Sequence, residues 1–192
     1  MKILIIDGHP DPDRARLCHA LADAYASGAR DGGHEVRRIE VANLDFPLLR
    51  SARAFKESEP PAAILDAQEA CMWANHLVLV YPIWLGTLPA LLKGFLEQLL
   101  RPDFAFEPTD KGWPKTKLDG RSARIIVTMG MPALAYRWLY GAHSLKSLER
   151  NVLKFVGIKP IRETLFGSVE NRGTAKRDAW LDEVRELGLA GK

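Results

Sequence analysis

The sequence has only two cysteines, Cys18 and Cys71, and neither belongs to a CxxC pair. A disulfide framework needs several cysteine pairs, and a structural zinc site needs closely spaced ligands. We therefore expect two free thiols, no bound metal and a reducing compartment.

Long apolar runs and concentrated charge are also missing. The first apolar run, residues 3–6, is followed directly by an acidic residue, which makes it too short for a signal peptide or a membrane span. No other stretch approaches the required length. The formal net charge of +3 is dispersed, whereas a nucleic-acid-binding protein gathers basic residues on one face. The sequence predicts a cytoplasmic protein that does not bind nucleic acid.

Several catalytic and nucleotide-binding motifs do not occur. The sequence contains no GxGxxG turn, no GxxxxGK[ST] loop, no HExxH and no GxSxG. These absences argue against a GxGxxG dinucleotide-binding fold and a P-loop, and against chemistry that uses a protein nucleophile or a metal.

Short apolar runs alternate with longer segments of helical period along the whole chain. We predict strands at 3–6, 36–41, 77–81, 125–128 and 160–166. The first run is apolar throughout, which is typical of a central strand, whereas 36–41 is more polar and is expected nearer a sheet edge. Helical patterns follow at 17–25, 63–74, 88–99, 145–155 and 180–187, and irregular segments at 44–61 and 102–118. This alternation indicates an α/β protein in which residues 1–192 form one domain with a doubly wound parallel sheet.

Ligands of such a sheet lie beyond the carboxyl ends of its strands, where the strand order reverses. Three loops leave those ends, at 9–18, 82–87 and 129–143. In the first, His9, Arg16 and the start of a helix could bind a phosphate, although a proline-stiffened connection that binds nothing is the alternative. In the second, Trp84 and low charge suit a flat aromatic ligand or packing under a neighbouring loop.

The third loop combines Gly130, which permits close backbone approach to a ligand, with the hydrogen-bonding rings of Tyr136 and His143. Either ring alone would more often be structural. The coincidence of three unusual loops at one sheet edge favours a site.

The segment at 81–106 carries a family resemblance. It reads Tyr-Pro-Ile-Trp-Leu-Gly-Thr-Leu-Pro-Ala-Leu-Leu-Lys-Gly-Phe-Leu-Glu-Gln-Leu-Leu-Arg-Pro-Asp-Phe-Ala-Phe and resembles the central signature of the NAD(P)H:quinone oxidoreductases. That family includes animal quinone reductase and bacterial ancillary subunits of potassium efflux systems. The Gly-His-Pro start and the Thr128–His143 segment fall where the family has its flavin loops, and the resemblance extends to about Gly167.

The resemblance implies a flavodoxin-like fold with strand order 2-1-3-4-5, a flavin cofactor, NAD(P)H (NADH or NADPH) as the electron donor and a quinone as the acceptor. The reaction would be a two-electron ping-pong transfer. We expect FMN, because the short chain lacks an obvious adenine-binding segment, with FAD as the alternative because 44–61 or 102–118 could supply one.

Carried over by position, the family's site residues fall into four groups. The flavin phosphate would be bound by His9, Ala15, Arg16, Leu17 and Cys18. The flavin ring would be lined by Pro82, Ile83, Trp84 and Leu85, and its far edge would meet Thr128, Met129, Gly130 and Met131. The catalytic residues would be Tyr136 and His143, which would hydrogen-bond the quinone oxygen.

The sequence departs from the family pattern at several of these positions. Arg16, Leu17 and Cys18 stand where relatives often have Ser, Phe and Asn. Met131 replaces a frequent Gly, and Gly86 replaces an aromatic residue.

Two aromatic residues in the later part of the third loop, Trp138 and Tyr140, predict a homodimer with its active sites near the interface, since aromatic side chains are favoured interface anchors. In the alternative they cap their own domain. Three other functions stay open: an electron-carrying flavodoxin, although such carriers are usually acidic with a Ser/Thr-rich phosphate loop; a regulatory subunit that docks on a membrane transporter; and a fold relative that has lost its flavin.

Overall fold

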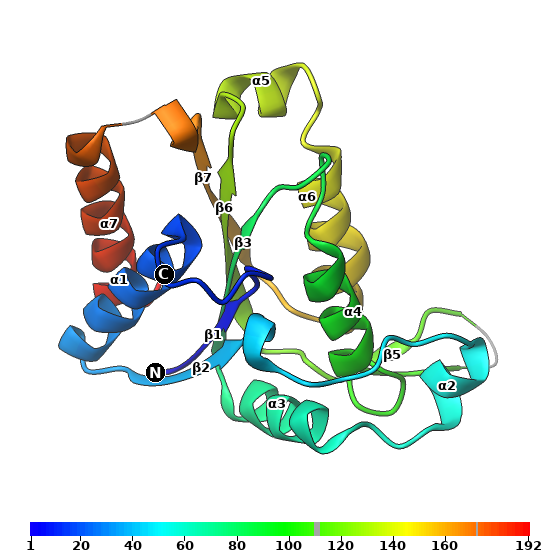
Figure 1. Cartoon of the computed structure of the whole chain (residues 1–192). Coiled ribbons are helices and arrows are strands. Elements are labelled where there is room, and N and C mark those ends of the chain that lie inside the picture. Colours follow the sequence, from blue (N-terminus) through cyan, green and yellow to red (C-terminus); the bar gives the residue numbers. More distant parts are fainter. Residues whose placement is uncertain (110–111, 172) are drawn as a thin grey trace.

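A five-stranded parallel sheet forms the centre of the computed structural model, which describes residues 1–109, 112–171 and 173–192 (Figure 1). Neighbouring strands lie in the order β2 (Glu35–Glu40), β1 (Lys2–Asp7), β3 (His76–Pro82), β6 (Ser122–Met129) and β7 (Ile161–Gly167). Each adjacent pair is parallel. Numbered along the chain, these strands have the order 2-1-3-4-5, which confirms the predicted doubly wound, flavodoxin-like sheet.

The apolar content of each strand explains its place in the sheet. β3 is buried along its whole length, and the four apolar residues at 3–6 of β1 are almost completely inaccessible. β2 has no fully buried residue and lies at the sheet edge, as predicted. Val41 was expected to continue this strand but instead begins the 3-10 turn η1 (Val41–Asn43), because its side chain leaves the edge and enters the core.

Helices cover both faces of the sheet (Figure 1). One face carries α1 (Leu17–Asp31) and α7 (Thr174–Leu189). The two helices pack closely at Gly28, where a Cβ atom would lie only 1.9 Å from the Arg185 carbonyl oxygen, so a residue without a side chain is required there. The other face carries α3 (Ala62–Trp73), α4 (Ala90–Leu99) and the consecutive segments α6 (His143–Ser147), η2 (Leu148–Leu153) and η3 (Lys154–Val156). The helix predicted at 145–155 thus combines α-helical, π-helical and 3-10 turns.

The connecting segments contain short elements of their own. Residues 44–61 include α2 (Ala52–Glu57), and 102–118 include the antiparallel pair β4 (Phe106–Glu107) and β5 (Lys115–Thr116). Residues 110–111 of the second segment lie outside the described residues. The loop after β6 contains α5 (Ala133–Trp138), and β7 is followed by η4 (Val169–Asn171). Within the described ranges, no helix is both long and apolar enough to cross a membrane.

His76 is a buried titratable group at the start of β3. Its Nδ1 lies 2.7 Å from the Ser122 hydroxyl oxygen, whereas its Nε2 is buried with no hydrogen-bond partner among the described residues. Burial, aided by the positive charges of Arg124 and Arg162, lowers the pKa of His76 to about 4. The folded protein therefore keeps this ring neutral at a pH where the unfolded chain binds a proton.

We expect this difference to make folding stability depend on pH. Between the ordinary histidine pKa of 6.5 and about 4, the unfolded state binds the extra proton, so the free energy of unfolding falls as the pH falls. From pH 7 to pH 5 this effect amounts to about 2 kcal/mol. His76→Asn keeps a group that can bond Ser122 but does not titrate, so its loss over that interval should be smaller by about this amount. Urea unfolding of both proteins at the two pH values measures the difference, and parallel losses would contradict the assignment.

Candidate functional site

The three predicted loops converge on one cavity at the carboxyl end of the sheet. The cavity has a volume of about 250 Å³ and lies beyond β1, β3 and β6, next to the reversal of strand order between β1 and β3. It is lined by His9, Arg16, Leu17, Cys18, Pro82, Ile83, Trp84, Thr128, Met129, Gly130, Val169 and Glu170.

Ten of the thirteen predicted cofactor-binding residues therefore surround this one cavity. Of the other three, Ala15 lines an adjoining cavity together with Arg16 and Leu17, and Leu85 lines a cavity on the opposite side of Trp84. Met131 packs against the apolar core. The binding of a flavin by these residues stays a prediction.

The first loop presents free backbone donors to the cavity edge. Side-chain carboxylates accept the amides of Asp13 and Ala15, each at 3.0 Å. In the first turn of α1, by contrast, the amides of Leu17 and Cys18 have no hydrogen-bond acceptor among the described residues. Unpaired N–H groups at the positive end of a 15-residue helix attract an anion.

Arg16 stands at the start of this helix with its side chain half exposed. Its guanidinium lies 2.7 Å from an Asp11 carboxylate oxygen and 3.4 Å from one of Asp13. A phosphate that binds here has to compete with these carboxylates for Arg16, whereas it meets the helix amides without competition.

His9 belongs to the first loop, and its ring contacts Trp84 of the second. Its Nδ1 lies 3.1 Å from the Asp11 amide nitrogen and 3.2 Å from the Asp11 carbonyl oxygen. When Nδ1 accepts the shorter contact, from the Asp11 N–H, the ring proton of neutral His9 is on Nε2. Its ring meets Trp84 edge-on at 5.9 Å between centroids. Burial lowers the pKa of His9, and the neighbouring His19 lowers it further, against the opposing effects of the Asp11 carbonyl and the carboxylates of Asp11 and Asp7. Neutral His9 can therefore donate a hydrogen bond from Nε2 at neutral pH.

The third loop is tied to the other two at Thr128. Its carbonyl oxygen accepts the Ile83 N–H at 2.8 Å, and its hydroxyl lies 3.3 Å from the Cys18 sulfur. Burial raises the pKa of the Cys18 thiol to about 12, and the Thr128 hydrogen bond only partly offsets this rise. Cys18 is therefore a protonated packing group that joins α1 to β6, and it is not a nucleophile.

Tyr136 and His143 do not line this cavity. Tyr136 is buried, with its hydroxyl 2.7 Å from the Ser144 hydroxyl and accepting the Leu145 N–H at 3.2 Å. His143 is exposed at the start of α6. The contacts of Tyr136 are those of a residue that holds the loop together, and the catalytic roles of both residues stay predictions.

Sequence reasoning missed Val169 and Glu170, which complete the cavity from η4. The signal was available, because these residues follow the fifth predicted strand, and the ends of parallel strands meet at one edge of the sheet. The Glu170 carboxylate lies close to the backbone of Gly130, since a Cβ on that glycine would be 3.7 Å from it.

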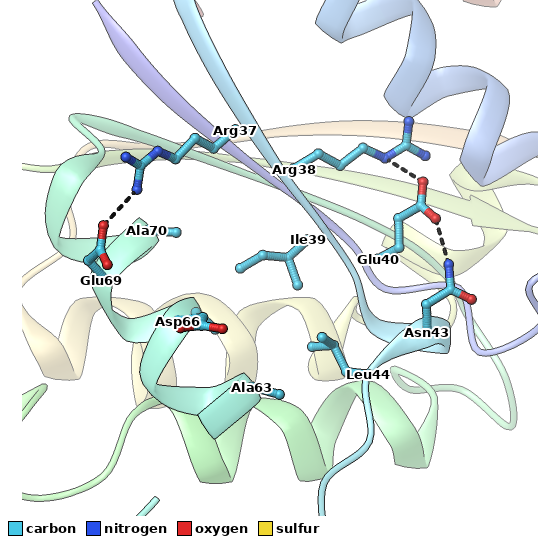
Figure 2. A pocket seen from close by; sticks show the side chains of 11 residues that line it. Arg37, Arg38, Ile39, Glu40, Asn43, Leu44, Ala63, Asp66, Glu69 and Ala70 are labelled. Atoms are coloured by element: carbon cyan, nitrogen blue, oxygen red, sulfur yellow. Dashed lines mark hydrogen bonds and ion pairs between the residues drawn. The ribbon is translucent and has the colours of Figure 1, made fainter. Parts of the chain in front are cut away.

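A larger cavity of about 660 Å³ lies between β2 and α3, away from the predicted residues (Figure 2). Four of its five charged side chains are paired with one another: Arg37 pairs with Glu69 at 3.2 Å, and Glu40 contacts Arg38 as well as Asn43. The smaller cavity, with its free amides and a free ring N–H, is therefore the candidate site. In the part of the chain that the structure describes, no cluster of three or more His, Cys, Asp or Glu residues could hold a metal ion.

The chain belongs to the flavodoxin-like fold family, whose model matches residues 1–187. It is 31% identical to a ribosyldihydronicotinamide dehydrogenase-like protein of Penicillium crustosum over 68% of this chain, and it spans only 58% of that relative's length. It is 25% identical to an FMN-dependent NADH:quinone oxidoreductase of Bacillus cereus, over 98% of this chain and 95% of that one. An NAD(P)H:quinone oxidoreductase structure from Methanothermobacter marburgensis superposes with a TM-score of 0.82 at 21% identity, covering 100% of this chain and 99% of the other.

Proposed function

We propose that this protein is an FMN-dependent NAD(P)H oxidoreductase that reduces quinones or similar small electrophilic acceptors. One observation carries the proposal: free helix amides, the His9 N–H and the half-exposed Trp84 ring converge on a cavity at the reversal of strand order. The Bacillus cereus relative, named for both FMN and quinone, supports the choice of cofactor and acceptor.

The residues present fit a flavin mononucleotide. The Leu17 and Cys18 amides, with Arg16 and His9, would hold the phosphate, and the segment at 82–85 would lie against the ring. Backbone amides at 128–131 would hydrogen-bond its polar edge, where the reduced cofactor gathers negative charge. Bound FMN would supply two-electron chemistry, in which a hydride from NAD(P)H is accepted and then passed to the acceptor.

Tyr136 and His143 would act on the acceptor side of the same site. In this proposal His143, with an exposed ring, hydrogen-bonds the acceptor oxygen as charge develops there. Tyr136 would reach that side through Ser144. The two hydroxyl groups are in contact, and Ser144 lines the neighbouring cavity that Trp84 and Leu85 also line.

The assembly belongs to the same proposal. Leu134, Trp138, Leu139 and Tyr140 expose between 56% and 84% of their surface around α5. Such a group of apolar side chains suits a twofold interface between two copies of the chain. With two buried free thiols, a homodimer in the cytoplasm is the proposed form.

The first prediction is that the protein retains one FMN per chain after desalting, with visible flavin absorbance. Arg16→Ala should raise the Kd for FMN about tenfold, because a charge-assisted bond to phosphate is lost at a half-exposed position. Arg185→Ala is the matched control, since Arg185 is similarly exposed and pairs with Asp31 at the other end of α1. Protein reconstituted with FMN or FAD that elutes colourless would refute the proposed cofactor site.

A second prediction concerns turnover. His143→Gln should slow one or both half-reactions by about tenfold to a thousandfold while flavin content stays near normal. Tyr136→Phe should do the same and also cost roughly 1 kcal/mol of stability, because Ser144 and Leu145 lose their partner. Stopped-flow measurement of flavin bleaching and recovery separates the two half-reactions. Unchanged rates in a flavin-replete double variant would exclude both roles.

A third prediction concerns the dimer. Sedimentation of the flavin-bound protein at micromolar concentration should give twice the chain mass, and Trp138→Glu should weaken association at least tenfold. Trp113 is equally exposed but lies away from α5, so Trp113→Glu should leave the dimer intact. A flavin-bound monomer in the unaltered protein would rule out the proposed assembly.

A further inference from the structure

His19 is buried in the first turn of α1 between two hydrogen-bond acceptors. Its Nδ1 lies 2.6 Å from the Asp7 carboxylate, and its Nε2 lies 2.9 Å from the Asp11 carbonyl oxygen. Only 2% of the residue's surface is exposed, so water cannot substitute for either contact. Because a carbonyl oxygen can only accept, Nε2 must carry a proton.

The Asp7 carboxylate is ionised in this arrangement. It is fully buried at the end of β1, where Arg38 donates to Oδ2 at 2.6 Å and the backbone N–H of His9 donates to Oδ1 at 3.3 Å. With donors already at both oxygens and a guanidinium beside it, Asp7 is an acceptor toward His19 as well. The Nδ1 of His19 must then also carry a proton, which makes the ring an imidazolium.

The charges of the surrounding network balance only if His19 is protonated. Arg38 contacts Asp23 and Glu40 in addition to Asp7, and Arg14 pairs with the same Asp23 and Glu40. The network then has three anions (Asp7, Asp23 and Glu40) and three cations (His19, Arg38 and Arg14). A neutral His19 would leave two guanidinium groups for three carboxylates, of which Asp7 is fully buried.

The same ring reaches the first loop through the backbone of one residue, Asp11. His19 donates to the Asp11 carbonyl, while the N–H of Asp11 donates to His9 Nδ1. The two imidazole rings lie 5.4 Å apart, close enough for a charge on one to oppose protonation of the other. Two neighbouring histidines thus have different roles, one charged within the fold and one neutral at the cavity.

We propose that His19 is a positioning residue of the flavin site. It is a buried imidazolium that holds the Asp11 backbone by its carbonyl, so that the Asp11 N–H orients His9 with its Nε2–H toward the phosphate. Its charge adds to the positive potential at the start of α1, beneath the phosphate loop. This inference rests on the proposed function, because the phosphate is that of the flavin.

A neutral ring would donate to only one of its two partners, so the Asp11 carbonyl or the Asp7 carboxylate would lose its donor. The groups that face the ring are Asp7 from β1, with Arg38 from β2 behind it, and His9 and Asp11 from the loop.

The first experiment measures the proton directly, in unaltered protein without flavin. Nitrogen-15 NMR of the histidine rings should show two protonated nitrogens in His19 at pH 7.5, because both ring nitrogens face acceptors. A single protonated nitrogen at that pH would overturn the proposal. This measurement needs no variant and does not depend on flavin binding.

The second experiment measures the Kd for FMN at pH 7.5, where the phosphate group is almost fully ionised. His19→Gln should raise this Kd about tenfold or more, because a neutral side chain replaces the charged donor. His34→Gln is the control, since His34 bonds the N-terminus at the opposite end of the sheet.

The outcomes separate this inference from the function on which it rests. If the unaltered protein binds no FMN, the proposed function fails, and the positioning role fails with it, whatever the ring's protonation. If FMN binds with an unchanged Kd in His19→Gln, only the positioning role fails. If that variant does not fold, the NMR result for the unaltered protein decides.

Discussion

Helices on both faces of a parallel sheet leave only the strand ends open to a ligand. The central strands of this chain are apolar on both sides, so they must be covered twice, by α1 and α7 on one face and by α3, α4 and α6 on the other. Every connection that leaves a carboxyl end therefore reaches the same edge. This constraint brings His9, Trp84 and Gly130 together although they are far apart in the sequence.

A cluster of buried polar contacts at the end of β1 holds this edge in place. Asp7 ends β1 as a fully buried carboxylate, and its donors come from β2, from α1 and from the first loop. On the other side of the cavity, Thr128 joins the second and third loops and contacts Cys18 in α1. Removing a single donor from Asp7 would leave part of a buried charge unpaired, so α1, β2 and the phosphate loop are energetically coupled.

The sheet and most of its site could be predicted because they depend on local pattern and strand position. The run at 3–6 and the run at 77–81 are apolar throughout, which was enough to place β1 and β3 at the centre, and their following loops then had to be neighbours. The 3-10 turn at Val41 could not be predicted, because its cause is a core position that only the folded chain defines. The same holds for the partners of Tyr136, since Ser144 and Leu145 come close only after α5 and α6 have formed.

Charge at the phosphate loop takes the place of hydrogen-bonding side chains. Relatives often have Ser and Asn at the positions of Arg16 and Cys18, and those side chains could bond a phosphate directly. Here Cys18 is buried as a thiol, so its side chain can offer the phosphate nothing, and its free backbone amide is what faces the cavity. The anion affinity of this loop must then come from the helix amides, from Arg16 and from the neighbouring imidazoles. Because the pKa of His9 is lowered, its neutral ring can supply a directed N–H but no charge, which leaves Arg16 as the positively charged side chain that lines the cavity.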